Sequence, residues 1–342
     1  MNRPTRFFFR VDRSPLIGLG HWARCQLLAG ALRAQGADVD FDEVSSSPDA
    51  FLTSIIAEGA RQLDWVVLDS YCLDEQWEIR ARAAGFRVLS IDDSPKRKYS
   101  ADVLLDPNLS EAGGERWLGS VASHTRVWAG ADYLLLRAEF LEAGAARRGL
   151  TRAPQILVSM GGADPPGMAL RVVQALTFLK GQAPGLALPE NMALLPADWQ
   201  GFRTTVLGGA LNIRSSELQA LVVGLPDAEY LSSSSSIAQL MAQADLCIGA
   251  GGGTIWERAY MELPSLVVTL AENQRDAVDH FQRKGAHVAL GWHEDLEPHG
   301  LARSIANALA DPNGLRAMAA KAKALVGEPG FVRDPLGYLS RV

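Results

Sequence analysis

The sequence predicts an α/β protein of two domains, each built on a parallel sheet flanked by helices. Three observations support this prediction: short apolar runs alternate with helix-like segments, the runs form two series, and a stretch rich in Ala, Gly and Arg separates the series. Short continuous apolar runs are typical of strands buried on both faces. The length of 342 residues also fits two domains, since a domain commonly spans about 100–200 residues.

The predicted strands fall into an amino-terminal and a carboxyl-terminal series. The first series is Phe7–Val11, Trp65–Leu68, Val88–Ile91 and Val103–Leu105. The second series is Ile156–Val158, Ala220–Val223, Leu246–Ile248, Leu266–Leu270 and Val288–Leu290. Helix-like segments such as Ala23–Gln35 and Ile255–Met261 lie between strands. Strands that alternate with helices predict parallel sheets with helices on both faces.

The domain junction is expected in Leu141–Pro154 (LEAGAARRGLTRAP), which ends in a proline before a new strand. We therefore expect domains over residues 1–145 and 154–342. Residues 179–216 contain several Gly and Pro without clear periodicity, so an irregular surface excursion is expected there. Because ligands of open parallel sheets bind beyond the carboxyl ends of the strands, informative residues should follow the strands directly.

Composition excludes several classes of protein. The chain is 48% apolar and 21% charged, which argues against disorder. A net charge of −6 without a basic stripe disfavours nucleic acid as a partner. Three scattered cysteines without a C-x-x-C pair favour a reducing compartment. The amino terminus has only a three-residue aromatic run, too short for a signal peptide, and no apolar stretch is long enough to span a membrane. A cytoplasmic protein without a membrane partner is expected.

The first candidate site is Gly18–Ala23 (GLGHWA), which follows a predicted strand and fits G-x-G-x-x-A. Asp38 and Asp40 lie about 20 residues further on, as in dinucleotide-binding proteins. This short pattern arises easily by chance, and the loop before it is longer than a tight Rossmann turn. An NAD-dependent oxidoreductase is therefore one alternative.

His21 is the most informative residue of this segment. It should lie in the first turn of a helix, where the positive potential disfavours imidazolium and so favours the neutral base. A neutral imidazole can orient water and accept its proton. The alternative is a histidine that only hydrogen-bonds at the helix start.

The second candidate site is the glycine-rich stretch Gly249–Glu257 (GAGGGTIWE), where a strand runs into a helix. Exposed N–H groups around Gly251, Gly252, Gly253 and Thr254 suit a diphosphate. Glu257, one turn into the helix, would accept hydrogen bonds from two ribose hydroxyls. A ligand-free turn with a solvent-facing Glu is the alternative, although so many glycines are entropically costly.

Other candidates are loop residues that follow strands. Gly161 and Gly162 would let a ligand approach the backbone, although a plain turn fits them equally well. Asn273 and Gln274 could bind sugar hydroxyls or acetamido groups. Asp69 and Tyr71 follow a predicted strand and would face a cleft between the two domains. We expect no metal and no cofactor, because neither H-E-x-x-H nor a Cys/His cluster is present and the P-loop motif is absent.

Taken together, these motifs resemble the UDP-sugar hydrolases of pseudaminic acid biosynthesis, which release 2,4-diacetamido-2,4,6-trideoxy-L-altrose from its UDP conjugate. The resemblance covers roughly residues 6–290. The motifs that support it are Arg10–Asp12 (RVD), Ile17–Cys25 (IGLGHWARC), Asp69–Tyr71 (DSY), Ile91–Asp93 (IDD), Trp128–Tyr133 (WAGADY), Leu136–Phe140 (LRAEF), Ser159–Gly162 (SMGG), Gly249–Glu257, Asn273 and Gln274. The chain departs from the family in residues 179–216 and at Trp22.

The resemblance implies a GT-B-like fold, with two Rossmann-like domains and a cleft between them, as in glycosyltransferases that use UDP-N-acetylglucosamine. It implies that His21 activates water and that Gly20 lies beside the substrate. The glycines before Glu257 would bind the diphosphate of UDP, and Glu257 itself the ribose. The resemblance also implies that Tyr71, Asn273 and Gln274 contact sugar or water.

The expected reaction is hydrolysis of a UDP-sugar at its anomeric carbon, with the UDP-sugar as the partner. A GT-B glycosyltransferase would use the same residues but admit an acceptor hydroxyl in place of water. A protein that binds sugar nucleotides without catalysis is a further alternative.

Overall fold

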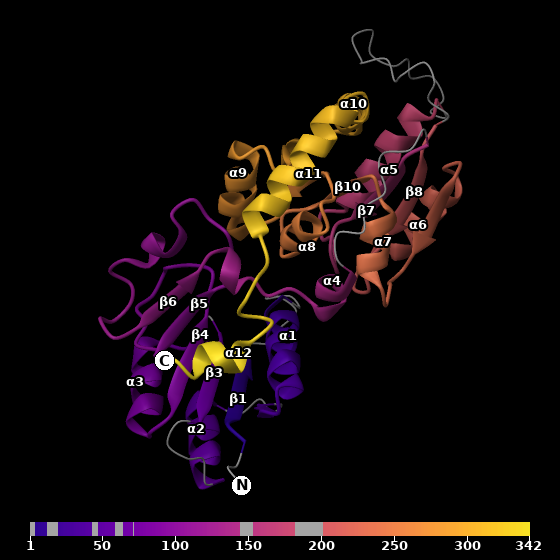
Figure 1. The fold of residues 1–342 in the computed structure, drawn as a ribbon. Helices are drawn as coiled ribbons and strands as arrows, with labels where there is room; N and C mark the ends of the chain where they lie inside the picture. The colour runs from indigo at the N-terminus through magenta and orange to yellow at the C-terminus, as the bar shows by residue number, and fades with distance from the viewer. Residues whose placement is uncertain are drawn as a thin grey trace. The chain divides into compact units, whose positions relative to one another are not determined.

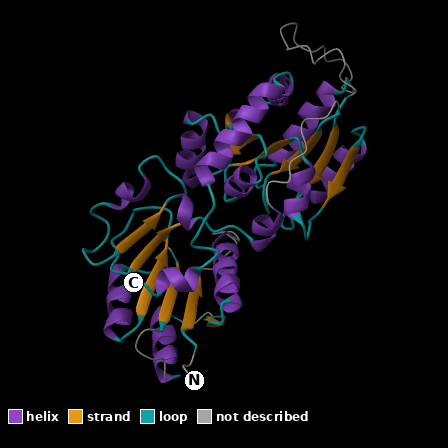
Figure 2. Ribbon diagram, viewed as in Figure 1, coloured by secondary structure: helices purple, strands orange, loops and turns teal. Residues whose placement is uncertain are grey.

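The computed structural model describes residues 4–11, 20–42, 47–58, 64–70, 72–143, 153–181 and 201–342. The chain divides into two compact units. Unit 1 comprises residues 1–137 together with 328–342, and unit 2 comprises residues 138–327 (Figure 1). Strands and helices alternate in both units, as Figure 2 shows. The predicted two-domain α/β class is therefore confirmed.

Unit 1 contains a six-stranded parallel sheet in the order β2-β1-β3-β4-β5-β6. Its strands are β1 (Arg6–Val11), β2 (Asp38–Phe41), β3 (Trp65–Asp69), β4 (Arg87–Ile91), β5 (Val103–Asp106) and β6 (Arg126–Ala129). Its α-helices are α1 (Gly20–Ala34), α2 (Pro48–Ala57), α3 (Glu75–Ala83) and α12 (Pro335–Leu339). Two short 3-10 helices, η1 (Gly113–Trp117) and η2 (Ala131–Tyr133), flank β6.

The aromatic run in β1 shows why the interior strands read as continuous apolar sequence. Successive strand side chains point to opposite faces of a sheet. Phe7 and Phe9 pack into one apolar cluster with Leu28 of α1, whereas Phe8 packs into another with Trp77 of α3. Both faces of this strand are covered, so all three phenylalanines are buried.

Unit 2 contains a second six-stranded parallel sheet, in the order β12-β11-β10-β7-β8-β9. Its strands are β7 (Gln155–Ser159), β8 (Arg203–Leu207), β9 (Ala228–Leu231), β10 (Leu246–Ala250), β11 (Ser265–Thr269) and β12 (Val288–Trp292). Its α-helices are α4 (Ala138–Ala143), α5 (Met168–Leu179), α6 (Ser215–Val223), α7 (Ile237–Gln243), α8 (Thr254–Tyr260), α9 (Arg275–Arg283), α10 (Pro298–Leu309) and α11 (Pro312–Val326). The 3-10 helices are η3 (Glu272–Gln274) and η4 (His293–Asp295).

Each sheet has one point at which the chain reverses the direction of strand addition. In unit 1 it lies between β1 and β3, because β2 was added on the other side of β1. In unit 2 it lies between β7 and β10, because β8 and β9 were added on the other side of β7. Ligands of open α/β sheets bind beyond the carboxyl ends of the strands at such points. In each unit, a ligand is therefore expected beside the residues that follow these strands.

Several sequence predictions at the level of single elements are wrong. Ala220–Val223 is the last turn of α6 and not a strand: Leu218 and Val222, four residues apart, are buried, and Val223 is 81% exposed. The expected irregular stretch 179–216 contains β8 and the start of α6, while residues 182–200 lie outside the described residues. The strands β2, β6, β8 and β9 were not predicted, since their four or five residues mix charged and apolar side chains.

The predicted boundary 154–342 assigned the carboxyl terminus to the second domain, and this assignment is wrong for residues 328–342. Residues 328–342 return to unit 1, and the yellow α12 lies among its indigo and purple elements (Figure 1). Phe331 packs against Trp128, with ring centroids 5.4 Å apart. The Asp132 carboxylate accepts hydrogen bonds from the Tyr338 hydroxyl at 2.6 Å and from the Gly330 N–H at 2.9 Å. At the other boundary, α4 already belongs to unit 2, and residues 144–152 lie outside the described residues.

His287 should make the stability of unit 2 sensitive to mild acid. Its Nε2 lies 2.9 Å from the Val278 carbonyl, and burial, with Arg258 nearby, lowers its pKa from 6.5 to about 4. The unfolded chain therefore binds a proton that the folded unit does not between those pH values, so stability falls as pH falls through this window. We expect a loss of about 2 kcal/mol between neutral pH and about pH 5. Urea unfolding at both pH values should show this loss in the parent chain and not in His287→Gln; equal losses would contradict it.

Candidate functional site

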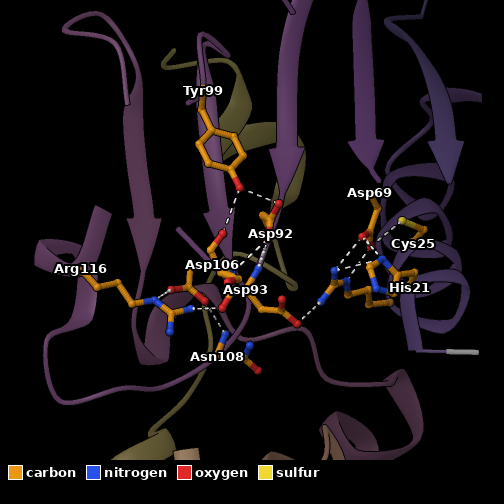
Figure 3. A network of polar contacts seen from close by, with 11 residues as sticks. His21, Cys25, Asp69, Asp92, Asp93, Tyr99, Asp106, Asn108 and Arg116 are labelled. Carbon is orange, nitrogen blue, oxygen red and sulfur yellow. Dashed lines mark hydrogen bonds and ion pairs between the residues drawn. The ribbon is translucent and has the colours of Figure 1, made fainter. Parts of the chain in front are cut away.

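In unit 1, His21 and Asp69 meet at the reversal point of the sheet. His21 lies in the first turn of α1, and Asp69 is the last residue of β3, paired in register with Val11 of β1. The Nδ1 atom of His21 forms a short hydrogen bond with Oδ1 of Asp69 (Figure 3). His21 is 6% exposed and Asp69 is completely buried. The side chain is thus held by a specific partner at the sheet edge.

Arg24 and Cys25, the next turn of α1, complete the surroundings of the Asp69 carboxylate. Two nitrogens of the Arg24 guanidinium donate hydrogen bonds to the Asp69 carboxylate. Nε lies 2.5 Å from Oδ2 and Nη2 lies 2.6 Å from Oδ1. The Cys25 thiol donates to Oδ2 at 3.4 Å. Burial alone would raise the pKa of Asp69, but the Arg24 charge and the hydrogen bonds from Arg24 and His21 lower it to about 2. Asp69 is therefore an ionised carboxylate and can only accept hydrogen bonds.

This arrangement fixes the tautomer of His21. An ionised carboxylate accepts and cannot donate, so the hydrogen between the two groups belongs to Nδ1 of His21. A neutral imidazole with its proton on Nδ1 has its lone pair on Nε2. The local geometry is therefore that of a base oriented by an ionised carboxylate. It can accept a proton from an O–H group in a reaction.

The network continues along the carboxyl ends of the neighbouring strands (Figure 3). Nη1 of Arg24 lies 3.6 Å from Oδ2 of Asp93, and the Asp93 carbonyl accepts from Nη2 of Arg116 at 3.0 Å. Arg116 also forms an ion pair with Asp106, the last residue of β5, at 2.7 Å. The Asp92 carboxylate accepts from the N–H groups of Asp93 at 2.7 Å and Ser94 at 3.0 Å, and so stabilises the turn after β4. Residues at the carboxyl ends of β3, β4 and β5 thereby form one polar network that includes Arg24.

In unit 1 one predicted residue has a different orientation from the expected one, one residue of the network was not predicted, and two predicted residues lie outside the described parts of the chain. Asp69 was expected to face substrate, but its carboxylate is enclosed by protein groups and orients His21 instead. Arg24 was not singled out, although its spacing of three from His21 places both on one face of a helix. Gly20 begins α1, beside His21. Gly18 and Tyr71 lie outside the described residues.

The acidic residues required by the dinucleotide alternative are occupied elsewhere. Arg6, the first residue of β1, forms ion pairs with Asp40 at 3.2 Å and with Asp38 at 3.5 Å. In dinucleotide-binding proteins, the acidic residue after the second strand instead holds the ribose at the carboxyl edge of the sheet. The pairing with Arg6 lies at the opposite, amino-terminal end of β1, which argues against an NAD-dependent oxidoreductase.

In unit 2, the first glycine pair follows β7 at the reversal point. Gly161 has a φ of +89°, which favours glycine, and a side chain at Gly161 or Gly162 would meet no atom within 4 Å. The Gly162 carbonyl accepts from the Leu211 N–H at 2.8 Å. Asp164 caps the start of α5 by accepting from the N–H groups of Met168 and Ala169, both at 2.9 Å. The turn is thus rigidly supported, and its glycines remain open on one side.

The glycines between β10 and α8 fall into two kinds. A Cβ on Gly249 would lie 2.8 Å from the Ser159 carbonyl, and one on Gly251 would lie 2.5 Å from a methyl group of Val278. These two positions need glycine for internal packing. A Cβ on Gly252 would approach only the Gln274 amide, at 3.8 Å, and one on Gly253 would meet nothing within 4 Å. Packing therefore explains the glycines at 249 and 251, whereas a side chain at 252 or 253 would meet no close neighbour.

The remaining predicted residues of unit 2 are Thr254, Glu257, Asn273 and Gln274, and they differ in burial and in their contacts with this turn. Thr254 begins α8, and its hydroxyl accepts from Arg258 at 2.8 Å. Glu257 is 8% exposed, which excludes the alternative of a solvent-facing side chain. The Gln274 oxygen accepts from the Leu270 N–H at 2.9 Å, which places its amide beside Gly251 and Gly252. Asn273 is exposed on η3.

Across the described residues, no group of three or more His, Cys, Asp or Glu side chains is arranged to hold a metal ion. Among the helices formed by those residues, none combines the length and the apolar character required to cross a membrane.

Residues 209–329 match the family model described as the glycosyltransferase family 28 C-terminal domain. The chain is 28% identical over 177 residues to "Spore coat polysaccharide biosynthesis protein SpsG" of Bacillus subtilis, which covers 51% of this chain and 46% of that protein. It is 23% identical over 298 residues to "Uncharacterized protein MJ1062" of Methanocaldococcus jannaschii, covering 80% and 57% respectively. The chain thus spans about half the length of the curated relatives it matches.

Solved structures resemble the chain over nearly its whole length. MurG of Acinetobacter baumannii superposes with a TM-score of 0.63 at 16% identity, covering 99% of this chain and 100% of that one. A glycosyltransferase of Rickettsia africae gives 0.62 at 13% identity, with 100% and 99% covered. The UDP-GlcNAc 2-epimerase of Neisseria meningitidis bound to UDP-GlcNAc gives 0.54 at 14% identity, with 99% and 100% covered. At these identities the likeness shows the fold, and the expected GT-B-like fold is confirmed.

Proposed function

We propose that the chain is an enzyme that breaks the bond between UDP and the anomeric carbon of a UDP-sugar, with His21 as the general base. The observation that carries this proposal is the buried His21–Asp69 pair. With the proton held on Nδ1 by Asp69, the Nε2 atom of a neutral His21 has a lone pair that can accept a proton. The open Gly252–Gly253 turn of unit 2 supplies a place for the diphosphate. The structures of similar fold include one with UDP-GlcNAc bound, which supports a UDP-sugar as ligand.

The proposed step moves one proton and exchanges one bond. An O–H group attacks the anomeric carbon from the face opposite UDP and gives its proton to Nε2 of His21. The bond from the anomeric carbon to the phosphate oxygen breaks, and UDP leaves with the electron pair. Asp69 stabilises the imidazolium that forms, and the N–H groups of the glycine turn stabilise the charge on the diphosphate. The configuration at the anomeric carbon inverts.

The nucleophile decides between two reactions. Transfer to an acceptor hydroxyl is favoured by the glycosyltransferase family 28 match over residues 209–329 and by the glycosyltransferase structures. The match to a spore coat polysaccharide biosynthesis protein favours a role in polysaccharide synthesis. Hydrolysis, with water as the nucleophile, is favoured by the G-x-G-H-x-x-R-C segment and by the burial of His21, which suits a small nucleophile. In that case the sugar would be a diacetamido-trideoxy sugar, whose acetamido groups Asn273 and Gln274 would contact.

An assay without acceptor separates these reactions. The chain is incubated with a panel of UDP-sugars, including UDP-GlcNAc and UDP-linked diacetamido-trideoxy sugars, and UDP and free sugar are measured. A hydrolase releases both at its full rate. A transferase releases UDP slowly until an acceptor such as an oligosaccharide or lipid-linked sugar is added.

Glu257→Ala should weaken UDP binding. We propose that its buried carboxylate accepts hydrogen bonds from the ribose hydroxyls, and losing charge-assisted hydrogen bonds of this kind costs roughly 1–3 kcal/mol. Calorimetry should show weaker binding of both UDP and uridine, since both contain the ribose. Glu217→Ala, which removes an exposed carboxylate from α6, is the matched control. Unchanged UDP affinity in a folded Glu257→Ala variant would rule out this placement of the ribose.

A further inference from the structure

Arg258 of α8 is a buried cation directly beneath the glycine turn. Its side chain is almost fully enclosed, with 1% of the residue exposed. Nη2 donates to the carbonyl of Ala250, the last residue of β10, at 2.9 Å, and Nη1 donates to the hydroxyl of Thr254, the first residue of α8, at 2.8 Å. The guanidinium therefore joins the two ends of the turn formed by residues 251–253.

The charge of Arg258 is only partly compensated. Within the described parts of the chain no carboxylate forms an ion pair with it, and its Nε is buried without a hydrogen-bond partner. Burial lowers the pKa of Arg258, and the nearby Glu257 carboxylate offsets part of that effect. The partly buried Arg24 and Arg116, in contrast, each face a carboxylate at 2.7 Å or less. An incompletely compensated buried cation is costly, and replacing such groups with apolar ones is often neutral or stabilising.

The backbone above Arg258 is short of acceptors. The N–H of Gly251 donates to Val268 at 2.9 Å, and that of Ile255 donates to the Gly252 carbonyl at 2.9 Å. Between them, in the part of the chain that the structure describes, no protein acceptor takes the N–H groups of Gly252, Gly253 or Thr254. Consecutive N–H groups of this kind, over a buried positive charge, form an environment that favours an anion.

We propose that Arg258 is the buried counter-charge and positioning residue of a diphosphate site on the Gly252–Gly253 turn. This inference rests on the proposed function, in which the diphosphate belongs to UDP. Arg258 does not touch the ligand. It holds the Ala250 carbonyl and the Thr254 hydroxyl toward itself, which fixes the shape of the turn, and its charge acts on the diphosphate across one layer of backbone. The ligand in turn completes the compensation of the buried cation.

The inference predicts effects of opposite sign on binding and stability. In Arg258→Met, the buried cation is gone and the volume is similar, so the melting temperature should equal or exceed that of the parent chain. The dissociation constants for UDP and for inorganic pyrophosphate should rise about tenfold to hundredfold, as expected for a lost charge interaction in a site shielded from water. The dissociation constant for uridine should stay unchanged, because the nucleoside carries no phosphate.

The experiment is calorimetry with UDP, pyrophosphate and uridine, together with thermal melting, on the parent chain and three variants. Arg258→Gln keeps a hydrogen-bond donor without the charge and gives the same readouts should Arg258→Met not fold. Arg303→Met, at an exposed position of α10, controls for the loss of one positive charge. Selective loss of UDP and pyrophosphate with an unchanged or raised melting temperature supports the inference.

Two results would overturn it. One is unchanged affinity for UDP and pyrophosphate in a folded Arg258 variant. The other is a lowered melting temperature with equal weakening of UDP and uridine, which is the pattern of a residue that only maintains the fold. A parent chain that binds pyrophosphate but not UDP would contradict the proposed function, but it would remain consistent with Arg258 as the counter-charge of a diphosphate site. A parent chain that binds neither would contradict both.

Discussion

Replacing His21 by Asn should slow release of UDP from the UDP-sugar by about 10²–10⁴-fold, the usual contribution of a general base. The affinity for UDP should stay close to that of the parent chain, because the proposed nucleotide site lies on unit 2. Asn is small enough to fit the buried position and keeps a donor for Asp69, so the fold should persist. The rate constant is measured at saturating UDP-sugar, with UDP affinity determined separately by calorimetry.

A histidine with a purely structural role would behave differently. Its replacement would lower the melting temperature, and the folded fraction would still turn over at the parent rate. His124→Asn is the matched control in unit 1, since the His124 ring also hydrogen-bonds, through Nε2 to the Ser100 carbonyl at 3.1 Å. A well-folded His21→Asn variant with the parent rate would show that the proposed mechanism is wrong.

Asp69→Asn should produce the second large effect, on both rate and stability. An Asn amide can donate to Nδ1 and so stabilise the wrong tautomer of His21, an effect worth about 10⁴ in rate when the analogous aspartate of a serine protease triad is replaced. The change also leaves the Arg24 guanidinium buried without its carboxylate, which should cost about 3–5 kcal/mol of stability. Nitrogen NMR of the imidazole reports the tautomer, and urea unfolding reports the stability.

A double variant separates the two effects of Asp69. Asp69→Asn combined with Arg24→Met removes the guanidinium that has lost its main carboxylate partner and should recover much of the stability, but not the rate. Full activity in Asp69→Asn, or loss of activity without any change of tautomer, would contradict the orienting role.

In the parent chain, the stability contributed by the Asp69 carboxylate should be present above about pH 4 and lost as pH falls toward 2, because the folded pKa lies below the unfolded value of 3.8.

The two sheets could be predicted because their central strands are buried on both faces. β1, with three consecutive phenylalanines, and β10 read as short continuous apolar runs, which are typical of strands buried on both faces. The similar run Ala220–Val223 instead ends a helix, because a run this short does not distinguish the two structures. The strands β2 and β9 lie at sheet edges and include charged residues such as Asp38 and Glu229, so the local pattern is lost. The return of residues 328–342 to unit 1 depends on long-range contacts such as that of Phe331 with Trp128, which no local pattern contains.

The sequence predicted which residues belong to the candidate site better than it predicted the contacts between them. His21 and the glycine turn follow strands, and the sequence places them at a sheet edge. The sequence could not show that Asp69 points at His21, since the two lie 48 positions apart and meet only through the pairing of β1 with β3. It also could not distinguish Gly249 and Gly251, which pack tightly against Ser159 and Val278, from the open Gly252 and Gly253.

The central claim is that the chain cleaves UDP from a sugar with His21 as the base. It is tested most directly by measuring UDP release from the UDP-sugar panel, with and without acceptors, for the parent chain and His21→Asn side by side. The parent chain is expected to release UDP from at least one donor, with inversion at the anomeric carbon, and His21→Asn is expected to lose this activity while still binding UDP. UDP release that is equally fast in both proteins, or no release from any donor by a parent chain that also fails to bind UDP, would contradict the account.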